Sequence, residues 1–210
     1  MRVRAISPER LVEELADRLA AAHPERWLRV AIDGAPATEP GALAAALIDP
    51  LRVRGRAARH VPAGGFLRPA SLRFEFGRDD PDGYYEGWLN EAGLRREVLD
   101  PLEPGGTGRI LPSLWDADTD RATRAAYEQV PAGGAVLVSG ALLLGGPLPF
   151  DVTVHLAAAP AALARRTAAG ERWTLPAFAR YEAEVAPASF ADVVVRVDDP
   201  RHPALVTPSP

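Results

Sequence analysis

Residues 27–51 read WLRVAIDGAPATEPGALAAALIDPL, and this stretch decides the fold. Its first part, Trp27 to Ile32, is a short apolar run typical of a buried strand. Asp33-Gly34 interrupts that run, and apolar residues then recur with the period of a helix from Ala42 to Leu51. A strand, a loop of small residues and a helix in this order predict one βα unit of a parallel sheet.

Apolar segments elsewhere in the chain continue the alternation of strands and helices. Helices are expected after the Ser7-Pro8-Glu9 start signal, over 84–102 (at least from 91 to 99), and over 160–168 and 173–185. Strands are expected over 57–61, 135–138, 152–156 and 191–197. The pattern predicts an α/β fold in three layers, a parallel sheet with helices on both faces. Residues 1–197 are expected to form a single domain, and residues 198–210 a loose Pro-rich tail.

The composition excludes several classes of function. The chain has 210 residues, a net charge of -4 and no cysteine, which argues against non-specific nucleic-acid binding and excludes disulfides and thiolate metal sites. It also lacks lysine, so chemistry that needs a lysine ammonium group cannot occur, and its abundance of Ala, Gly, Pro and Arg is typical of a GC-rich genome. The longest apolar stretch, 134–144, is too short to span a bilayer, and we expect a cytoplasmic protein without membrane contact.

The loop after the first strand has the length of a phosphate-binding loop. Such a loop wraps phosphates with backbone N–H groups, and its Gly-Lys-Ser/Thr end supplies an ammonium group and a hydroxyl ligand for Mg²⁺. Those three positions are Glu39, Pro40 and Gly41 here, which bring a negative charge, remove a donor and offer no hydroxyl. Thr38 carries a hydroxyl in the wrong register. Taken alone, the loop is more simply an ordinary βα turn, with Asp33 interpreted as a helix cap.

Five further segments resemble landmarks of the uridine kinase-like proteins of the P-loop nucleoside kinase group. Residues 77–85, GRDDPDGYY, are similar to that family's GR-x-SPEG-aromatic-Y stretch. The others are DPLEPGG at 100–106, WDADTD at 115–120 (FDHRTD in the family), AVLVSGALLL at 135–144 (VLLVDGIFL) and RRTAAGER at 165–172, similar to its arginine-bearing lid. The resemblance covers residues 10–199 and implies a P-loop NTPase-like fold with a small lid, a nucleoside substrate, and ATP with Mg²⁺ as cofactors.

The same comparison shows what this chain lacks. The family's VDDFHRP, whose acidic residue would accept the proton of the nucleoside hydroxyl, is PAGGFLRP at 62–69, with Gly64 and Gly65 in place of both aspartates. The family's VDG has Ser139 at its acidic position, and Ala117 replaces the histidine of FDH. Phosphoryl transfer depends on positioning and on cancelling charge, so the joint loss of these groups predicts little residual activity.

Several family positions keep residues suited to a ligand. By resemblance they would line the nucleoside cleft and the lid, with tyrosines stacking on a ring and arginines holding an anion. The simpler explanation, that these tyrosines complete the core and these arginines solvate helix faces, stays open. The candidates are Arg68, Arg78, Tyr84, Tyr85, Asp116, Arg165, Arg166 and Arg172, beside the degenerate loop residues Asp33, Gly34, Thr38, Glu39, Pro40 and Gly41.

The four histidines do not have the spacing of a metal site, so no metal is predicted. His155 lies in an apolar strand and is expected to be a core residue whose hydrogen bonds are satisfied. A serine hydrolase is not expected, because Ser139 is not in a Gly-x-Ser-x-Gly elbow.

Three hypotheses follow, and no catalytic residue is assigned in the first. The chain is a catalytically impaired kinase homologue that acts by binding a nucleoside, a nucleotide or another protein. Alternatively, it is an active small-molecule kinase in which arginines such as Arg68 or Arg165 replace the lysine. The third is a cleft adapted to other chemistry, with Asp116 and the tyrosines as candidates. Homo-oligomerisation stays open.

Overall fold

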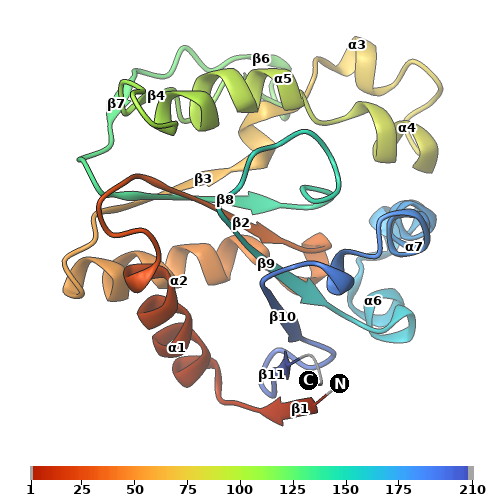
Figure 1. The fold of residues 1–210 in the computed structure, drawn as a ribbon. Coiled ribbons are helices and arrows are strands. Elements are labelled where there is room, and N and C mark those ends of the chain that lie inside the picture. Colours follow the sequence, from red (N-terminus) through yellow and green to blue (C-terminus); the bar gives the residue numbers. More distant parts are fainter. Residues whose placement is uncertain (1, 208–210) are drawn as a thin grey trace.

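Seven strands form one central sheet in the computed structural model, which describes residues 2–207. The order across the sheet is β1-β11-β10-β9-β2-β8-β3 (Figure 1). Its strands are β1 (Arg2–Ala5), β2 (Leu28–Asp33), β3 (Ala58–Pro62), β8 (Ala135–Gly140), β9 (Val152–Ala157), β10 (Val193–Arg196) and β11 (Ala204–Thr207). The five strands from β10 to β3 are parallel, and β11 and β1 add antiparallel pairs at one edge.

Strand β2 is the middle one of the five parallel strands and is buried on both faces. Val30 and Ile32 pack into the hydrophobic cluster on one face, and Ala31 packs into the cluster on the other. All three are fully buried, as expected for a parallel strand covered on both sides. This explains why the segment is a continuous apolar run, and it confirms the predicted three-layer α/β fold.

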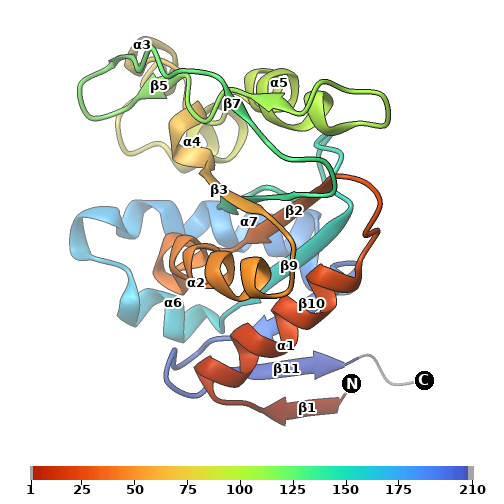
Figure 2. The same ribbon diagram turned by 90° about the vertical axis from the view of Figure 1, so that its left-hand side faces the viewer.

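Helices α1 (Pro8–Ala21) and α2 (Pro40–Val53) cover one face of the sheet. Figure 2 shows them side by side in front of the strands. The Ser7 side chain caps α1 by accepting the Arg10 N–H, as Ser-Pro-Glu predicted. Leu11, Leu15 and Leu19, one helical turn apart, are the buried stripe of α1.

The buried Arg56 joins the end of α1 to the start of β3. Its guanidinium donates to the carbonyl oxygens of Leu19, Ala20, Ala22, His23 and Arg26, where α1 ends and the chain turns toward β2. The last carbonyls of a helix have no partner inside the helix, so this side chain satisfies groups that would otherwise be buried without a donor.

The other face is covered by a module of short elements, seen at the top of Figure 1. It contains a 3-10 turn (Ala63–Phe66), α3 (Ala70–Arg73), α4 (Pro81–Gly87), α5 (Glu91–Leu94), a π turn (Arg95–Leu99), a 3-10 turn (Asp100–Leu102), and the pairs β4 (Arg109–Ile110) with β7 (Glu128–Gln129) and β5 (Trp115–Asp116) with β6 (Arg121–Ala122).

The helix expected over 84–102 is therefore interrupted between Gly87 and Glu91, whereas its expected minimal extent, 91–99, is helical as α5 and the π turn. Between α4 and α5 the backbone pairs with a neighbouring segment: Arg68 N–H donates to the Trp88 carbonyl and Asn90 N–H to the Phe66 carbonyl. Asn90 then caps α5 by accepting the Gly93 N–H. These partners replace the bonds that would continue a helix.

The C-terminal part of the chain lies beside the carboxyl ends of the central strands (Figure 1). It contains α6 (Pro160–Arg166), a 3-10 segment (Ala169–Thr174), α7 (Leu175–Glu184) and a 3-10 turn (Pro187–Ser189). The loose tail expected from Asp198 onward contains β11, because the backbone of Ala204–Thr207 finds partners on both β10 and β1. Within residues 2–207, no helix has the length and apolar character needed to cross a bilayer.

Candidate functional site

The loop between β2 and α2 offers few backbone donors. It contains a 3-10 turn, Pro36–Thr38, and α2 begins at Pro40. Neither proline has an N–H group. The N–H groups of Thr38 and Glu39 donate inside the loop, to the carbonyls of Ala35 and Pro36 at 2.7 and 3.0 Å. A phosphate cradle needs such groups free and converging, so these four positions contribute no donor to one.

The Thr38 side chain points into the loop and hydrogen-bonds to the loop backbone. It is buried, and its hydroxyl donates to the Ala35 carbonyl at 2.7 Å. It also lies so close to Gly34 that a Cβ at that glycine would clash with the hydroxyl oxygen. The hydroxyl is thus used within the loop and is not directed outward as a metal ligand would be.

Glu39 brings a carboxylate to the first turn of α2. The residue adopts the left-handed conformation, with φ 60° and ψ 49°, and its side chain is exposed. One carboxylate oxygen lies 3.6 Å from Nη2 of Arg166 at the end of α6, and Nη1 of this arginine donates to the Val197 carbonyl at 2.7 Å. The Arg166 guanidinium beside the loop is therefore already bound, to the Glu39 carboxylate and to a backbone carbonyl.

Asp33 is the centre of a buried polar network. Its carboxylate accepts the Leu143 N–H at 2.9 Å, lies 2.7 Å from Nδ1 of His155, and accepts the Tyr181 hydroxyl at 3.2 Å. The expected role of Asp33 as a cap of α2 is wrong, because Glu39 occupies the cap position. Asp33 lies instead at the carboxyl end of β2, where it connects the segment after β8 with β9 and α7.

His155 is protonated at neutral pH within this network. Burial disfavours the imidazolium, but the hydrogen bond with Asp33 and the charges of Asp33 and Glu182 outweigh it and raise the pKa of His155 to about 9. Its Nε2 lies 3.5 Å from a Glu182 oxygen and makes no hydrogen bond. The expectation of a core histidine is confirmed, except that one of its nitrogens lacks a hydrogen-bond partner.

Ser139 occupies the position where the family has an acidic residue, and it contacts His60. Its hydroxyl oxygen lies 2.7 Å from His60 Nε2. Burial lowers the pKa of His60, so the imidazole is neutral at pH 7. Ser139 is buried, and neither residue lines the main cavity.

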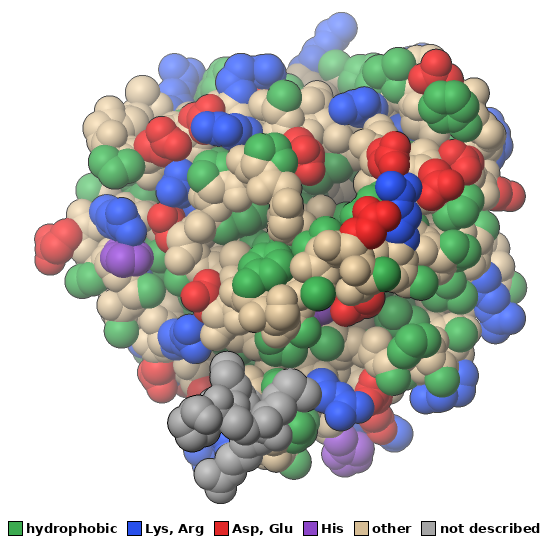
Figure 3. Space-filling model, turned by 45° about the vertical axis from the view of Figure 1, so that its right-hand side comes forward, with side chains coloured by type: hydrophobic (Ala, Val, Ile, Leu, Met, Phe, Trp, Pro, Cys, Tyr) green, Lys and Arg blue, Asp and Glu red, His purple; other side chains and the backbone are tan. Residues whose placement is uncertain are grey.

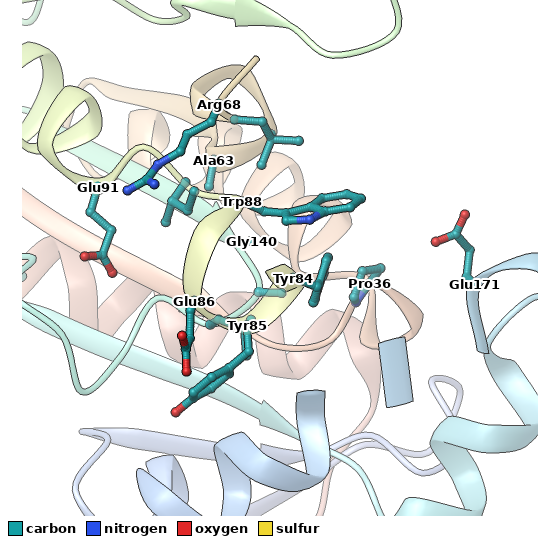
Figure 4. A pocket seen from close by; sticks show the side chains of 15 residues that line it. Pro36, Ala63, Arg68, Tyr84, Tyr85, Glu86, Trp88, Glu91, Gly140 and Glu171 are labelled. Atoms are coloured by element: carbon teal, nitrogen blue, oxygen red, sulfur yellow. The ribbon is translucent and has the colours of Figure 1, made fainter. Parts of the chain in front are cut away.

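The cavity lined by three of the predicted cleft residues, called the main cavity below, has a volume of about 380 Å³. It lies between the short-element module and the carboxyl end of β8 (Figure 4). Tyr84 and Tyr85 of α4 line it, and Trp88, which the sequence analysis did not single out, follows them along the wall. The complete lining is Pro36, Ala63, Gly64, Leu67, Arg68, Tyr84, Tyr85, Glu86, Trp88, Leu89, Glu91, Gly140, Ala141, Leu142 and Glu171.

Aromatic rings pack against one another in the cavity wall. The ring of Tyr84 packs edge-on against Trp88, Trp173 and Phe178, with centroids 5.0, 5.6 and 5.9 Å away. Burial, together with the nearby charge of Glu171, raises the pKa of Tyr84 to about 12. This phenol is therefore neutral across the physiological range and does not act as a base there.

An arginine of α7 holds α4 in place beside the cavity. The Arg180 guanidinium lies 2.9 Å from Asp82, 2.7 Å from Glu86 and 2.8 Å from Glu184, and sits over the Tyr85 ring at 4.5 Å. No local sequence pattern predicts this cluster, because its members come from two helices about 100 residues apart. Acidic and basic side chains are also interspersed across the face drawn in Figure 3.

The structure brings together only part of the predicted ligand set. Of the eight candidates in the cleft and lid, Arg68, Tyr84 and Tyr85 line the cavity. The others lie elsewhere: Arg78 over the Phe74 ring, Asp116 accepting the N–H groups of Asp118 and Thr119 in a turn, Arg166 at the loop, and Arg165 and Arg172 on the surface.

Solved structures share this arrangement of elements, and two of them are described as kinases. A possible uridine kinase from Bacillus stearothermophilus matches with a TM-score of 0.72 and 17% identity, over 89% of this chain and 97% of that one. A candidate fructose transport system kinase from Silicibacter sp. TM1040 has a TM-score of 0.57 and 21% identity, over 81% and 88% of the two chains. The YGR205w protein has a TM-score of 0.57 and 6% identity, over 94% and 97%.

No protein-family model matches the sequence, and no curated protein matches it. The chain thus shares its fold with these structures although the sequence identity is low. This is expected, because the packing of a sheet and its covering helices can be retained while the side chains change. The chain has the fold of the uridine kinase-like P-loop kinases.

Proposed function

We propose that this kinase-like chain does not transfer phosphoryl groups and acts by binding a small molecule in its main cavity. The observation that carries the proposal is the loop between β2 and α2. Its two prolines lack N–H groups, and the N–H groups of Thr38 and Glu39 donate to carbonyls of the loop itself. The Thr38 hydroxyl fills the space beside Gly34. A triphosphate would also meet the Glu39 carboxylate, with no lysine to offset it.

The remaining kinase groups are also replaced. Ser139 and the neutral His60 form a hydrogen-bonded pair where a carboxylate would assist the metal, and Gly64 lines the cavity without a base. For the arginine-based kinase, in which Arg68 or Arg165 would replace the lysine, Arg68 lines the cavity and Arg165 is exposed on the surface. Arg166, which lies beside the loop, is bound to Glu39 and the Val197 carbonyl. A cleft adapted around Asp116 would need that carboxylate at the cavity, and it caps a turn instead.

The test is calorimetric titration with Mg·ATP, followed by a nucleoside phosphorylation assay. We expect no heat of binding at millimolar nucleotide from the natural chain. The variant E39G/P40K/G41S removes the carboxylate and supplies the ammonium group and hydroxyl, so it should gain measurable binding. A Cβ at Gly41 would lie 3.6 Å from the Ser139 hydroxyl oxygen, which is ordinary contact, so serine fits there.

A control separates the loop geometry from the change in charge. Glu25 is exposed and outside the loop, and Glu25→Lys raises the net charge by the same two units as the loop variant. This control should bind no Mg·ATP. Binding of Mg·ATP by the natural chain, with phosphorylation of a nucleoside at an ordinary rate, would overturn the proposal.

A further inference from the structure

The main cavity carries a net negative charge. Its lining has one guanidinium, Arg68, against the carboxylates of Glu86, Glu91 and Glu171. Glu86 is neutralised from outside the cavity by Arg180 at 2.7 Å. Among the side chains of residues 3–206, no arginine or histidine nitrogen lies within 4.0 Å of the carboxylate of Glu91 or Glu171.

The two unpaired carboxylates lie on opposite sides of the aromatic wall. Figure 4 shows Glu91 on one side of the Tyr84 and Trp88 side chains and Glu171 on the other, with the cavity between them. The Arg68 guanidinium points toward Glu91 in the same view, so a ligand that stacks on the rings meets a carboxylate without a cationic neighbour among the described side chains at the Glu171 end. The volume of about 380 Å³ is at the lower end of the range for small-molecule sites.

The rings of this wall already stabilise cations. The Arg180 guanidinium lies 4.5 Å from the centroid of Tyr85, and that of Arg73 lies 5.1 Å from the centroid of Trp88. The face of an aromatic ring attracts a positive charge, and a nearby carboxylate strengthens this attraction. An anion in the cavity would instead approach ring faces and unpaired carboxylates together, with the exposed Arg68 as its only cationic neighbour in the lining.

We propose that the cavity binds a small organic cation, a primary or quaternary amine with a flat apolar body. The apolar body would lie against Tyr84 and Trp88, and the ammonium group would face the Glu171 carboxylate. This inference rests on the proposed function, because it takes the cavity to be a binding site that does not receive phosphate. Beyond the proposed function, the inference specifies that the ligand is positively charged and that its apolar part is flat.

Three probes of similar size and different charge test the inference by calorimetry at pH 7: phenethylamine (cationic), phenethyl alcohol (neutral) and 3-phenylpropanoate (anionic). We expect the amine to bind about tenfold more tightly than the alcohol, and the anion to give no heat. Glu171→Gln should reduce the amine's affinity toward that of the alcohol and leave the alcohol unchanged. The matched control, Glu25→Gln, removes an exposed carboxylate outside the cavity and should leave all three affinities unchanged.

Equal affinities for the three probes, tighter binding of the anion, no heat with any probe, or an unchanged amine affinity in Glu171→Gln would each overturn the inference. The Mg·ATP titration reports on the proposed function separately. A chain that binds neither amine nor nucleotide disproves only the organic cation, whereas one that phosphorylates a nucleoside disproves the proposed function whatever the amine does.

Discussion

Replacing His155 should remove a pH-dependent part of the stability of the fold. The pKa of this imidazole rises from its ordinary value of 6.5 to about 9 in the folded chain. Because the folded state binds the proton more tightly, the contribution is complete below pH 6.5 and is lost as the pH rises toward 9. A rise of this size corresponds to about 3 kcal/mol in the free energy of unfolding.

The measurement is urea unfolding of the natural chain and of His155→Gln at intervals between pH 6 and pH 9.5. Subtracting the two free energies at each pH cancels the titration of groups common to both chains. We expect the stability advantage of the natural chain to fall by about 3 kcal/mol over this window. His202→Gln serves as the control for loss of an imidazole, because His202 is exposed on the surface.

A difference between His155→Gln and the natural chain that stays constant from pH 6 to pH 9.5 would refute the reasoning. It would mean that His155 does not change its protonation between the folded and unfolded states, and that the bond with Asp33 is one between neutral imidazole and carboxylate. The variant Asp33→Asn provides a second test of the same pH dependence. Without this carboxylate the cost of burying the imidazolium is no longer offset by Asp33, so the pKa of His155 should fall. The loss of stability between pH 6.5 and pH 9 should then disappear, and stability should instead fall as the pH drops below 6.5.

Two further substitutions probe the packing around the loop and α1. Gly34→Ala should destabilise the fold by about 2 kcal/mol, because its Cβ would meet the Thr38 hydroxyl, whereas Gly41→Ala, with no neighbour nearer than 3.6 Å, should be far better tolerated in thermal unfolding. Arg56→Met should cost about 3 kcal/mol in denaturant unfolding, since it leaves the buried carbonyls at the end of α1 without a donor, and Arg52→Met on the exposed face of α2 should cost little.

Local patterns predicted the elements that depend mainly on local signals. The capped helix α1 and the apolar runs of β2, β8 and β9 could be read from the sequence, because a stripe at helical spacing or a buried run carries its own signature. The chemistry missing from the loop was equally visible. Glu39 and Pro40 lack an ammonium group in any fold, and the proline lacks an N–H group as well.

Only the tertiary structure decided which distant residues meet. Asp33 contacts His155, 122 residues further along the chain, because the parallel strands β2 and β9 place these two residues side by side. Its contact with Tyr181, 148 residues further along, depends on the packing of α7 against the same end of the sheet. The break between α4 and α5 and the strand β11 likewise depend on backbone partners elsewhere in the chain. The role of a charged or aromatic side chain depends on such neighbours, and the local sequence around that side chain does not identify them.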